Sequence, residues 1–395
     1  MPDLIAQYLE LGLALGRHID GMVDAYYGPA DLAARVAAEP VRPPAELEAR
    51  ARRLLADLAA DDQLDAARRH FLAAQVVGLR TTAAKLGGQS IGYADEVEAC
   101  YGVRPHMMPE ETFAAAHQRL NEVLPGSGPL AERYVTWRES QAVPPDKLRA
   151  AIGNLAEDLR DRTATLWGLP EGEQVEFDLV TNKPWSGFNY YQGDLRSRVV
   201  INVDLPVLST SLGHLVAHEA YPGHHTEHCR KEVGLVRRRR HLEETIFLVG
   251  TPQCLMAEGL ADLGLEMAAG RRPEPMVASH LRPLGIAYDA DLIAQLSEAG
   301  EALGHVRGNA ALMLHDGGAD VDTVVDYLAR WSLTSRARAE KGVQFLTDPT
   351  WRAYIYCYIE GVALCRRFVA GDPARFARLI TEQLTPADLA ATAPR

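Results

Sequence analysis

The chain has 395 residues and a formal net charge of −12. This length allows two or three ordinary domains, and the acidic balance argues against nucleic acid and anionic membranes as partners, because phosphate recognition requires a basic face. Hydrophobic residues make up 47% of the sequence, which is enough to bury a large core. The five cysteines are widely spread and form no C-x-x-C pair, a pattern that predicts a cytoplasmic protein without a disulfide framework.

Helical periodicity dominates the first 167 residues, where glycines and prolines mark the ends of most segments. The first segment carries Asp3 and Glu10 where a secretory signal would be basic, so we expect an amphipathic helix there. No stretch of the sequence approaches the roughly 20 apolar residues that a membrane-spanning helix needs. The predicted helices are 3–25, 31–38, 45–59, 64–86, 90–101, 109–123, 130–140 and 145–166.

The helical periodicity of the sequence ends at Gly168. Segments 175–180 and 197–203 are short, rich in β-branched residues and partly alternating, so we expect a hairpin or a small sheet. A segment rich in aromatic residues, glycine and proline joins them. Two interpretations are open: an edge strand that pairs with the backbone of a peptide substrate, or a hairpin that only caps a helical fold.

Helices are predicted again after this β-region. The arginine run at 237–240 is expected to be a solvated face, with a carboxylate clamp for a substrate as the alternative. The sequence therefore predicts a mainly α fold in one compact unit, with an N-terminal helical part (1–167) and a second part (168–395) that contains the β-region at 175–204. The helices predicted in the second part are 207–220, 242–269, 276–300, 301–314, 319–332, 334–346, 348–370 and 373–384.

One stretch of the second part, HLVAHEAYPGHHTEH at 214–228, holds five of the chain's 13 histidines. Histidine followed by glutamate opens a zinc-hydrolase motif, in which the imidazole binds the metal and the glutamate takes a proton from the attacking water. In the usual form, H-E-x-x-H, both histidines lie on one face of a helix. Here Glu219 follows His218 directly, but the next histidine is His224.

A regular helix does not bring these histidines together. At about 100° per residue, His224 lies about 240° round the axis from His218, and His225 lies about 10 Å further along it. Two nitrogens on one zinc ion must lie within about 3.5 Å of each other. Pro222 and Gly223 offer a solution, because they permit a local bulge that would swing His224 back beside His218.

A second ligand pair needs no bulge. His214 and His218 have the i, i+4 spacing that places both rings on one helical face. In that pair Glu219 would lie just outside the second ligand instead of between the two. The spacing argument alone leaves both pairs open.

A tetrahedral catalytic zinc site needs a third protein ligand and keeps one position open. Glu258 is a candidate because it lies within an apolar run on the predicted helix 242–269, which is an unusual setting for a solvated glutamate. Asp262 lies one turn later on the same face, where it is placed to orient a ligand histidine through the free ring N–H.

The motif HEAYPGHH at 218–225, with AEGLAD at 257–262, resembles the bacterial domain of unknown function 885 family. Every fixed position of that family's HEAxPGHH is matched here, and its downstream E-G-W-A is matched except for Leu260 in place of tryptophan. A late tyrosine-x-x-glycine is matched at Tyr358 and Gly361. The segment GMVDAYYGP at 21–29 and the strand that carries Asn202 are also similar to that family.

This resemblance implies a helical zinc metallopeptidase-like protein of the glutamate-ligated type, with 168–395 as its metal-binding catalytic part. It favours His218, His224 and Glu258 as the zinc ligands, and so His224 over His214. His214 and His225 are then expected beside the ligands and not among them. Tyr358 is expected to donate to the developing oxyanion, and the alternative is an aromatic core stripe that it forms with Tyr354.

The expected function is zinc-dependent hydrolysis of short peptides, with Glu219 as the general base that passes its proton to the leaving amine. Two alternatives are a non-haem iron enzyme, which uses the same two-histidine, one-carboxylate set, and a metal-binding scaffold without turnover.

Overall fold

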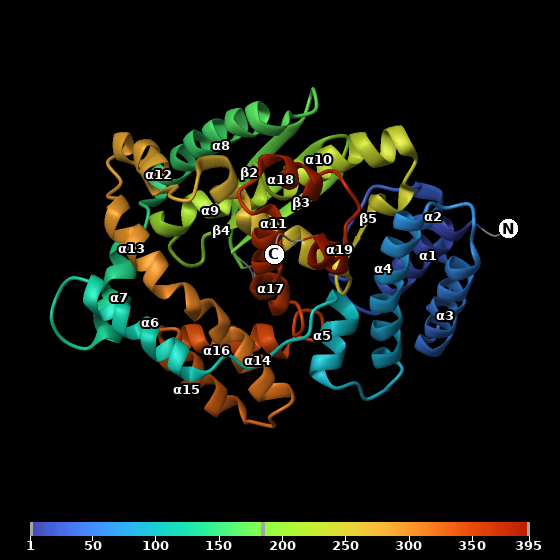
Figure 1. Cartoon of the computed structure of the whole chain (residues 1–395), viewed down its shortest axis with the longest axis horizontal. Helices are drawn as coiled ribbons and strands as arrows, with labels where there is room; N and C mark the ends of the chain where they lie inside the picture. The colour runs from blue at the N-terminus through green and yellow to red at the C-terminus, as the bar shows by residue number, and fades with distance from the viewer. Residues whose placement is uncertain (1–2, 183–185, 393–395) are drawn as a thin grey trace.

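A computed structural model describes residues 3–182 and 186–392 of the chain. Helices make up most of it and two small sheets complete it, as Figure 1 shows, so the predicted mainly α fold is confirmed. None of the helices in these ranges is long and apolar enough to cross a membrane.

Four N-terminal helices form a bundle at one end of the molecule (Figure 1, blue). On α3 the buried residues Leu47, Ala51, Leu54 and Leu58 recur every three or four positions and therefore lie on one face. This face packs against the other helices of the bundle in a hydrophobic cluster of its own. The four helices are α1 (Leu4–Leu15), α2 (Ala30–Ala38), α3 (Pro44–Ala60) and α4 (Ala66–Leu86).

The prediction of one helix over 3–25 is wrong after residue 15. Gly21 has a φ of +77°, a left-handed conformation that interrupts the helix, and the chain continues as strand β1 (Val23–Tyr26). This strand pairs antiparallel with β5 (Ile246–Leu248), inside the range predicted as helix 242–269. The helix there, α11 (Pro252–Ala269), begins only after this strand.

The next four helices match their predicted ranges closely. They are α5 (Tyr93–Tyr101), α6 (Glu110–Val123), α7 (Leu130–Ser140) and α8 (Pro145–Trp167). Helices α5, α6 and α8 share one hydrophobic core with the helices of the second part, since Leu155 of α8 and Leu255 of α11 belong to the same cluster of buried side chains. Helix α7 packs in a smaller cluster with α6 and α13 (Ala290–Gly300). The division at residue 167 is therefore not marked by a gap in the core.

The second sheet has three strands and not the predicted two. They are β2 (Gln174–Val180), β3 (Gly187–Gly193) and β4 (Arg196–Asn202), in the order β2-β4-β3. The two predicted strands, β2 and β4, pair in parallel, so they do not form a hairpin. The segment that joins them supplies β3, which pairs antiparallel with β4 and leaves its other edge beside the histidine motif.

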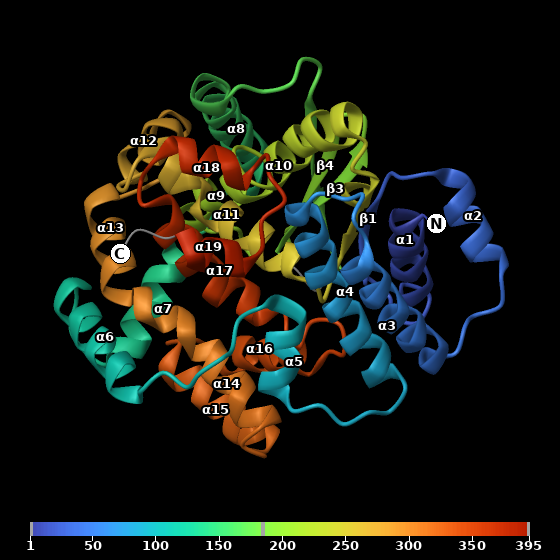
Figure 2. The same ribbon diagram turned by 45° about the vertical axis from the view of Figure 1, so that its right-hand side comes forward.

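Three helices meet in the middle of the molecule, and the first two of them carry the histidine motif. They are α9 (Ser209–Glu219), α10 (His224–Lys231) and α17 (Ile355–Val369), and α11 runs through the centre, where Figures 1 and 2 show it beside α17. A Cβ atom on Gly259 would lie 2.4 Å from the backbone of Gly361, so α11 and α17 cross at two glycines that permit this close approach.

The remaining helices enclose this centre. Predicted helix 276–300 is divided, because Gly285 takes a φ of +66° after the first segment. Predicted helix 348–370 begins only at Ile355. The arginines at 237–240 are exposed, as predicted for a solvated face. These helices are α12 (Glu274–Leu281), α13 (Ala290–Gly300), α14 (Val306–His315), α15 (Val321–Trp331), α16 (Arg336–Thr347), α18 (Pro373–Leu379) and α19 (Pro386–Thr392).

Candidate metal centre

The histidine motif is divided between two helices. Helix α9 ends at Glu219, and α10 begins at His224. Between them the backbone N–H of Gly223 donates to the carbonyl of Ala217 at 2.9 Å, which folds the chain back on the end of α9. A Cβ atom on Gly223 would lie 1.9 Å from the carbonyl oxygen of His218, so this turn requires glycine. The predicted bulge is thus a full break between two helices.

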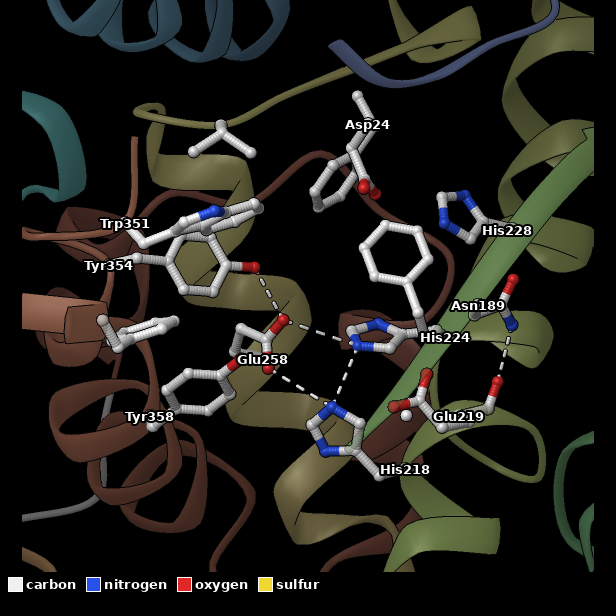
Figure 3. A pocket seen from close by; sticks show the side chains of 15 residues that line it. Asp24, Asn189, His218, Glu219, His224, His228, Glu258, Trp351, Tyr354 and Tyr358 are labelled. Atoms are coloured by element: carbon white, nitrogen blue, oxygen red, sulfur yellow. Dashed lines mark hydrogen bonds and ion pairs between the residues drawn. The ribbon is translucent and has the colours of Figure 1, made fainter. Parts of the chain in front are cut away.

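This turn brings the two histidines side by side. The Nε2 atoms of His218 and His224 lie 3.1 Å apart, which is within the separation that two ligands of one zinc ion need. Glu258 reaches the same point from α11, with Oε2 at 3.3 Å from the nitrogen of His218 and Oε1 at 3.5 Å from that of His224. Figure 3 shows the three side chains converging. Sequence analysis named all three.

The orientation of His218 is set by Asp262. Its Nδ1 lies 2.8 Å from Oδ1 of Asp262, so this nitrogen carries the proton and the lone pair of Nε2 faces His224 and Glu258. Burial alone would raise the pKa of Asp262, but hydrogen bonds from His214 and His218 lower it well below its ordinary value. Asp262 is therefore a charged acceptor that fixes the ring, as expected from its position one turn after Glu258.

Asp262→Asn is expected to keep the fold and weaken zinc affinity by about 10–100-fold, because an amide accepts the ring N–H without the charge that raises the basicity of His218. Zinc affinity is measured by competition with a chromogenic chelator. The control is Glu298→Gln, which removes an exposed carboxylate on α13, outside the motif, and should have no effect. Wild-type affinity of Asp262→Asn would contradict this role.

Glu258 is held as a charged carboxylate with one free oxygen. Burial alone would raise its pKa, but the neighbouring rings of His218 and His224 lower it to about 2. The hydroxyl of Tyr354 donates to Oε1 at 2.7 Å, whereas Oε2 is buried and accepts no hydrogen bond from the described residues. A carboxylate with an orphaned oxygen, next to two ring nitrogens, is a donor set that fits a divalent cation. The contact of Tyr354 with Glu258 was not anticipated.

Glu219 lies beside this group without joining it (Figure 3). Its carbonyl oxygen accepts a hydrogen bond from Nδ2 of Asn189 at 2.6 Å. Its carboxylate is buried and makes no hydrogen bond or ion pair with any residue that the structure describes. Burial raises the pKa of Glu219, although His218 and His224 act to lower it. A carboxylate with a raised pKa suits proton transfer near neutral pH.

Tyr358 and His214 flank the group on two sides. The hydroxyl of Tyr358 points towards Glu258 in Figure 3, and its ring lies 5.6 Å from that of Tyr354. His214 approaches only through Asp262, with its Nε2 at 3.2 Å from Oδ1. His214, His218 and Asp262 form a second group with metal-ligand chemistry, but it is more exposed and uses the other nitrogen of His218. Asp262 already accepts the ring N–H there.

His225 does not lie beside the ligands as expected. It is fully buried, and its two nitrogens lie 2.8 Å from Oγ of Ser197 and 2.8 Å from Oε2 of Glu173. Tyr221 also donates to this carboxylate, at 2.6 Å. Because His225 follows His224 on α10, its ring points away from His218. The contact with Ser197 joins the start of α10, just after the turn from α9, to strand β4.

A pocket with a cavity volume of about 110 Å³ opens beside the ligand group. Burial raises the pKa of Asp24 to about 7, with a further contribution from Glu258 and Glu219 that His224 opposes. Sequence analysis assigned no role to Asp24 or Asn189. The walls of this pocket include the side chains of Asp24, Phe188, Asn189, Phe247, Phe345 and Trp351.

No family model matches the chain, and no curated protein matches it. Among solved structures it is similar to a chain described as a "putative lipoprotein" from Colwellia psychrerythraea, with a TM-score of 0.52 and 16% identity over 88% of this chain and 65% of that one. A "putative lipoprotein of unknown function" from Shewanella oneidensis gives a TM-score of 0.47 and 12% identity over 91% and 75%. The first likeness concerns the fold alone. The resemblance to the domain of unknown function 885 family rests on the sequence motifs.

Proposed function

We propose that the chain is a zinc-dependent hydrolase of short peptides, with His218, His224 and Glu258 as the metal ligands. One observation carries the proposal: two ring nitrogens lie 3.1 Å apart beside a buried carboxylate, one oxygen of which accepts no hydrogen bond from the described residues. The set is two neutral imidazoles and one carboxylate, which is typical of catalytic zinc sites with an open fourth position.

A zinc ion bound here would act as a Lewis acid and lower the pKa of a bound water to about 7. Glu219 accepts the proton of the attacking water and delivers it to the leaving nitrogen. Tyr358 donates its hydroxyl to the carbonyl oxygen of the substrate as negative charge develops there. The aromatic side chains of the pocket exclude other water from the reacting group.

The position of Glu219 favours hydrolysis over the iron alternative. Non-haem iron enzymes use the same ligand types but need no carboxylate beside the first histidine. Here the carboxylate of Glu219 is buried next to the ligand group and has no partner within the described residues that would give it a structural role.

The proposal is tested on protein purified without added metal. Elemental analysis should find about one zinc ion per chain, as a single three-ligand site requires. Incubation with a mixture of short peptides, followed by mass spectrometry, should show cleavage that a chelator abolishes and added zinc restores. Iron in place of zinc would support the oxygenase alternative, and zinc-loaded protein that cleaves no peptide would support a scaffold.

A further inference from the structure

The pocket beside the ligand group contains hydrogen-bond acceptors that have no donor among the described residues. Asp24, on β1, points into the pocket in Figure 3, and its carboxylate makes no hydrogen bond or ion pair with the residues that the structure describes. Asn189, on β3, lies on the wall of the same pocket and is only 8% exposed. Both residues lie outside the proposed set of metal ligands.

The orientation of Asn189 follows from its partner. Its Nδ2 donates to the carbonyl oxygen of Glu219 at 2.6 Å, and a carbonyl only accepts, so the amide cannot be turned the other way. Its Oδ1 is consequently left buried, without a donor among the described residues. A buried acceptor of this kind costs free energy unless a ligand or water supplies the missing N–H or O–H.

The charges that line the pocket also favour a positively charged ligand. Its described lining holds three carboxylates, those of Asp24, Glu219 and Glu258, and no lysine or arginine. A zinc ion would balance two of these three negative charges, so one of the three carboxylates would keep no counter-charge from a lysine or arginine of the described lining. Burial also lowers the pKa of His228 well below its ordinary value, so this neighbouring ring stays neutral. An ammonium group on a ligand would supply this positive charge beside Asp24.

We infer that Asp24 and Asn189 bind the free α-ammonium group of the substrate, so that the site acts on the amino-terminal residue of short peptides or amino-acid amides. This inference rests on the proposed hydrolase function. An ammonium group has three N–H donors, which match a carboxylate and an amide oxygen. The α-ammonium group is next to the first carbonyl of a peptide, so holding it here places that bond in the pocket that contains His224 and Glu258.

The lining also indicates what the substrate presents around its amino group. Phe247, Phe345 and Trp351 supply apolar walls, which suit an apolar side chain on the first residue. Recognition of a C-terminal carboxylate would need an arginine, a lysine or backbone N–H donors. No arginine or lysine is present in the part of the lining that the structure describes.

The test compares leucine p-nitroanilide with its N-acetyl derivative, which lacks the positive charge. The wild-type protein should prefer the free amine. Asp24→Asn should reduce the ratio of the two kcat/KM values by at least about 30-fold, which is about 2 kcal/mol at 1.4 kcal/mol per factor of ten. Asp24→Glu keeps the charge and should retain the preference. The control Asp20→Asn removes an exposed carboxylate from the same segment and should leave the ratio unchanged.

A second measurement does not depend on turnover. Calorimetry on zinc-loaded Glu219→Gln protein should show tighter binding of leucyl-glycine than of N-acetyl-leucyl-glycine, and the added Asp24→Asn change should remove the difference. If binding shows this preference but the wild-type protein cleaves neither anilide nor peptide, the ammonium site stands and the hydrolase proposal fails. If peptides are cleaved but Asp24→Asn leaves both ratios unchanged, the ammonium site is wrong and the hydrolase proposal stands.

Discussion

Glu219→Gln is expected to reduce peptide hydrolysis by at least about 10²-fold, the lower range for loss of a general base, while zinc content stays near that of the wild type. The amide keeps the shape of the side chain but cannot accept a proton. The carboxylate that it replaces has no hydrogen-bonding or ionic partner among the described residues, so its loss should leave the fold intact. The hydrogen bond from Asn189 is also kept, because it goes to the backbone carbonyl of Glu219.

Zinc content and peptide turnover should be measured on the same preparation of this variant. Glu176→Gln is the matched control, since it makes the same chemical change at an exposed position on β2. Loss of zinc in step with activity would make Glu219 a structural residue. Full activity with zinc retained would remove it from the mechanism.

The helices could be predicted because their signals are local. On α3 a single apolar face recurs with the helical period, and Pro44 lies at its first turn. Strands β1 and β5 could not be predicted in this way. Each is short, and each is stabilised by a partner more than two hundred residues away in the sequence, as in the pair Val23 and Leu248. Such pairing leaves no periodic signal in either segment.

The three proposed metal ligands were predicted in two steps. Spacing and turn chemistry allowed His218 with His224 but left His214 with His218 open, and the resemblance to the domain of unknown function 885 family favoured the first pair. A straight helix excludes His218 and His224 as a pair, and Gly223 is the residue that allows the chain to fold back between them. Asp262 followed from helical spacing on α11. The histidines and Asp262 were inferred from short spacings in the sequence. Glu258 was inferred as the third ligand because it lies within an apolar run.

The other residues of the pocket could not be predicted, because they come from segments that are far apart in the sequence. Asp24, Asn189 and Tyr354 come from β1, β3 and the start of α17, and nothing in their local sequence relates them. The available signals were weak: an acidic residue in an otherwise apolar segment, and the i, i+4 spacing of Tyr354 with Tyr358. His225 shows that neighbours in the sequence can also belong to different sites. It directly follows the candidate ligand His224, but its own ring contacts Glu173.

Removal of any proposed ligand should have the largest effect on the metal. His218→Ala, His224→Ala and Glu258→Ala are each expected to weaken zinc binding by more than about 100-fold, beyond the range for loss of an orienting partner. Each change removes one of only three protein donors. Zinc is measured by elemental analysis after dialysis and by chelator competition, with circular dichroism to verify that each variant is folded.

His214→Ala is the matched control for these substitutions and separates the two possible metal groups. Its ring is half-exposed and touches Asp262, so its loss should leave most of the zinc in place. Suppose instead that His214→Ala loses zinc and His224→Ala retains it. The metal would then bind between His214, His218 and Asp262, through Nδ1 of His218. That nitrogen cannot both bind zinc and donate to Asp262, so the orientation of His218 on which the proposed centre depends would also be wrong.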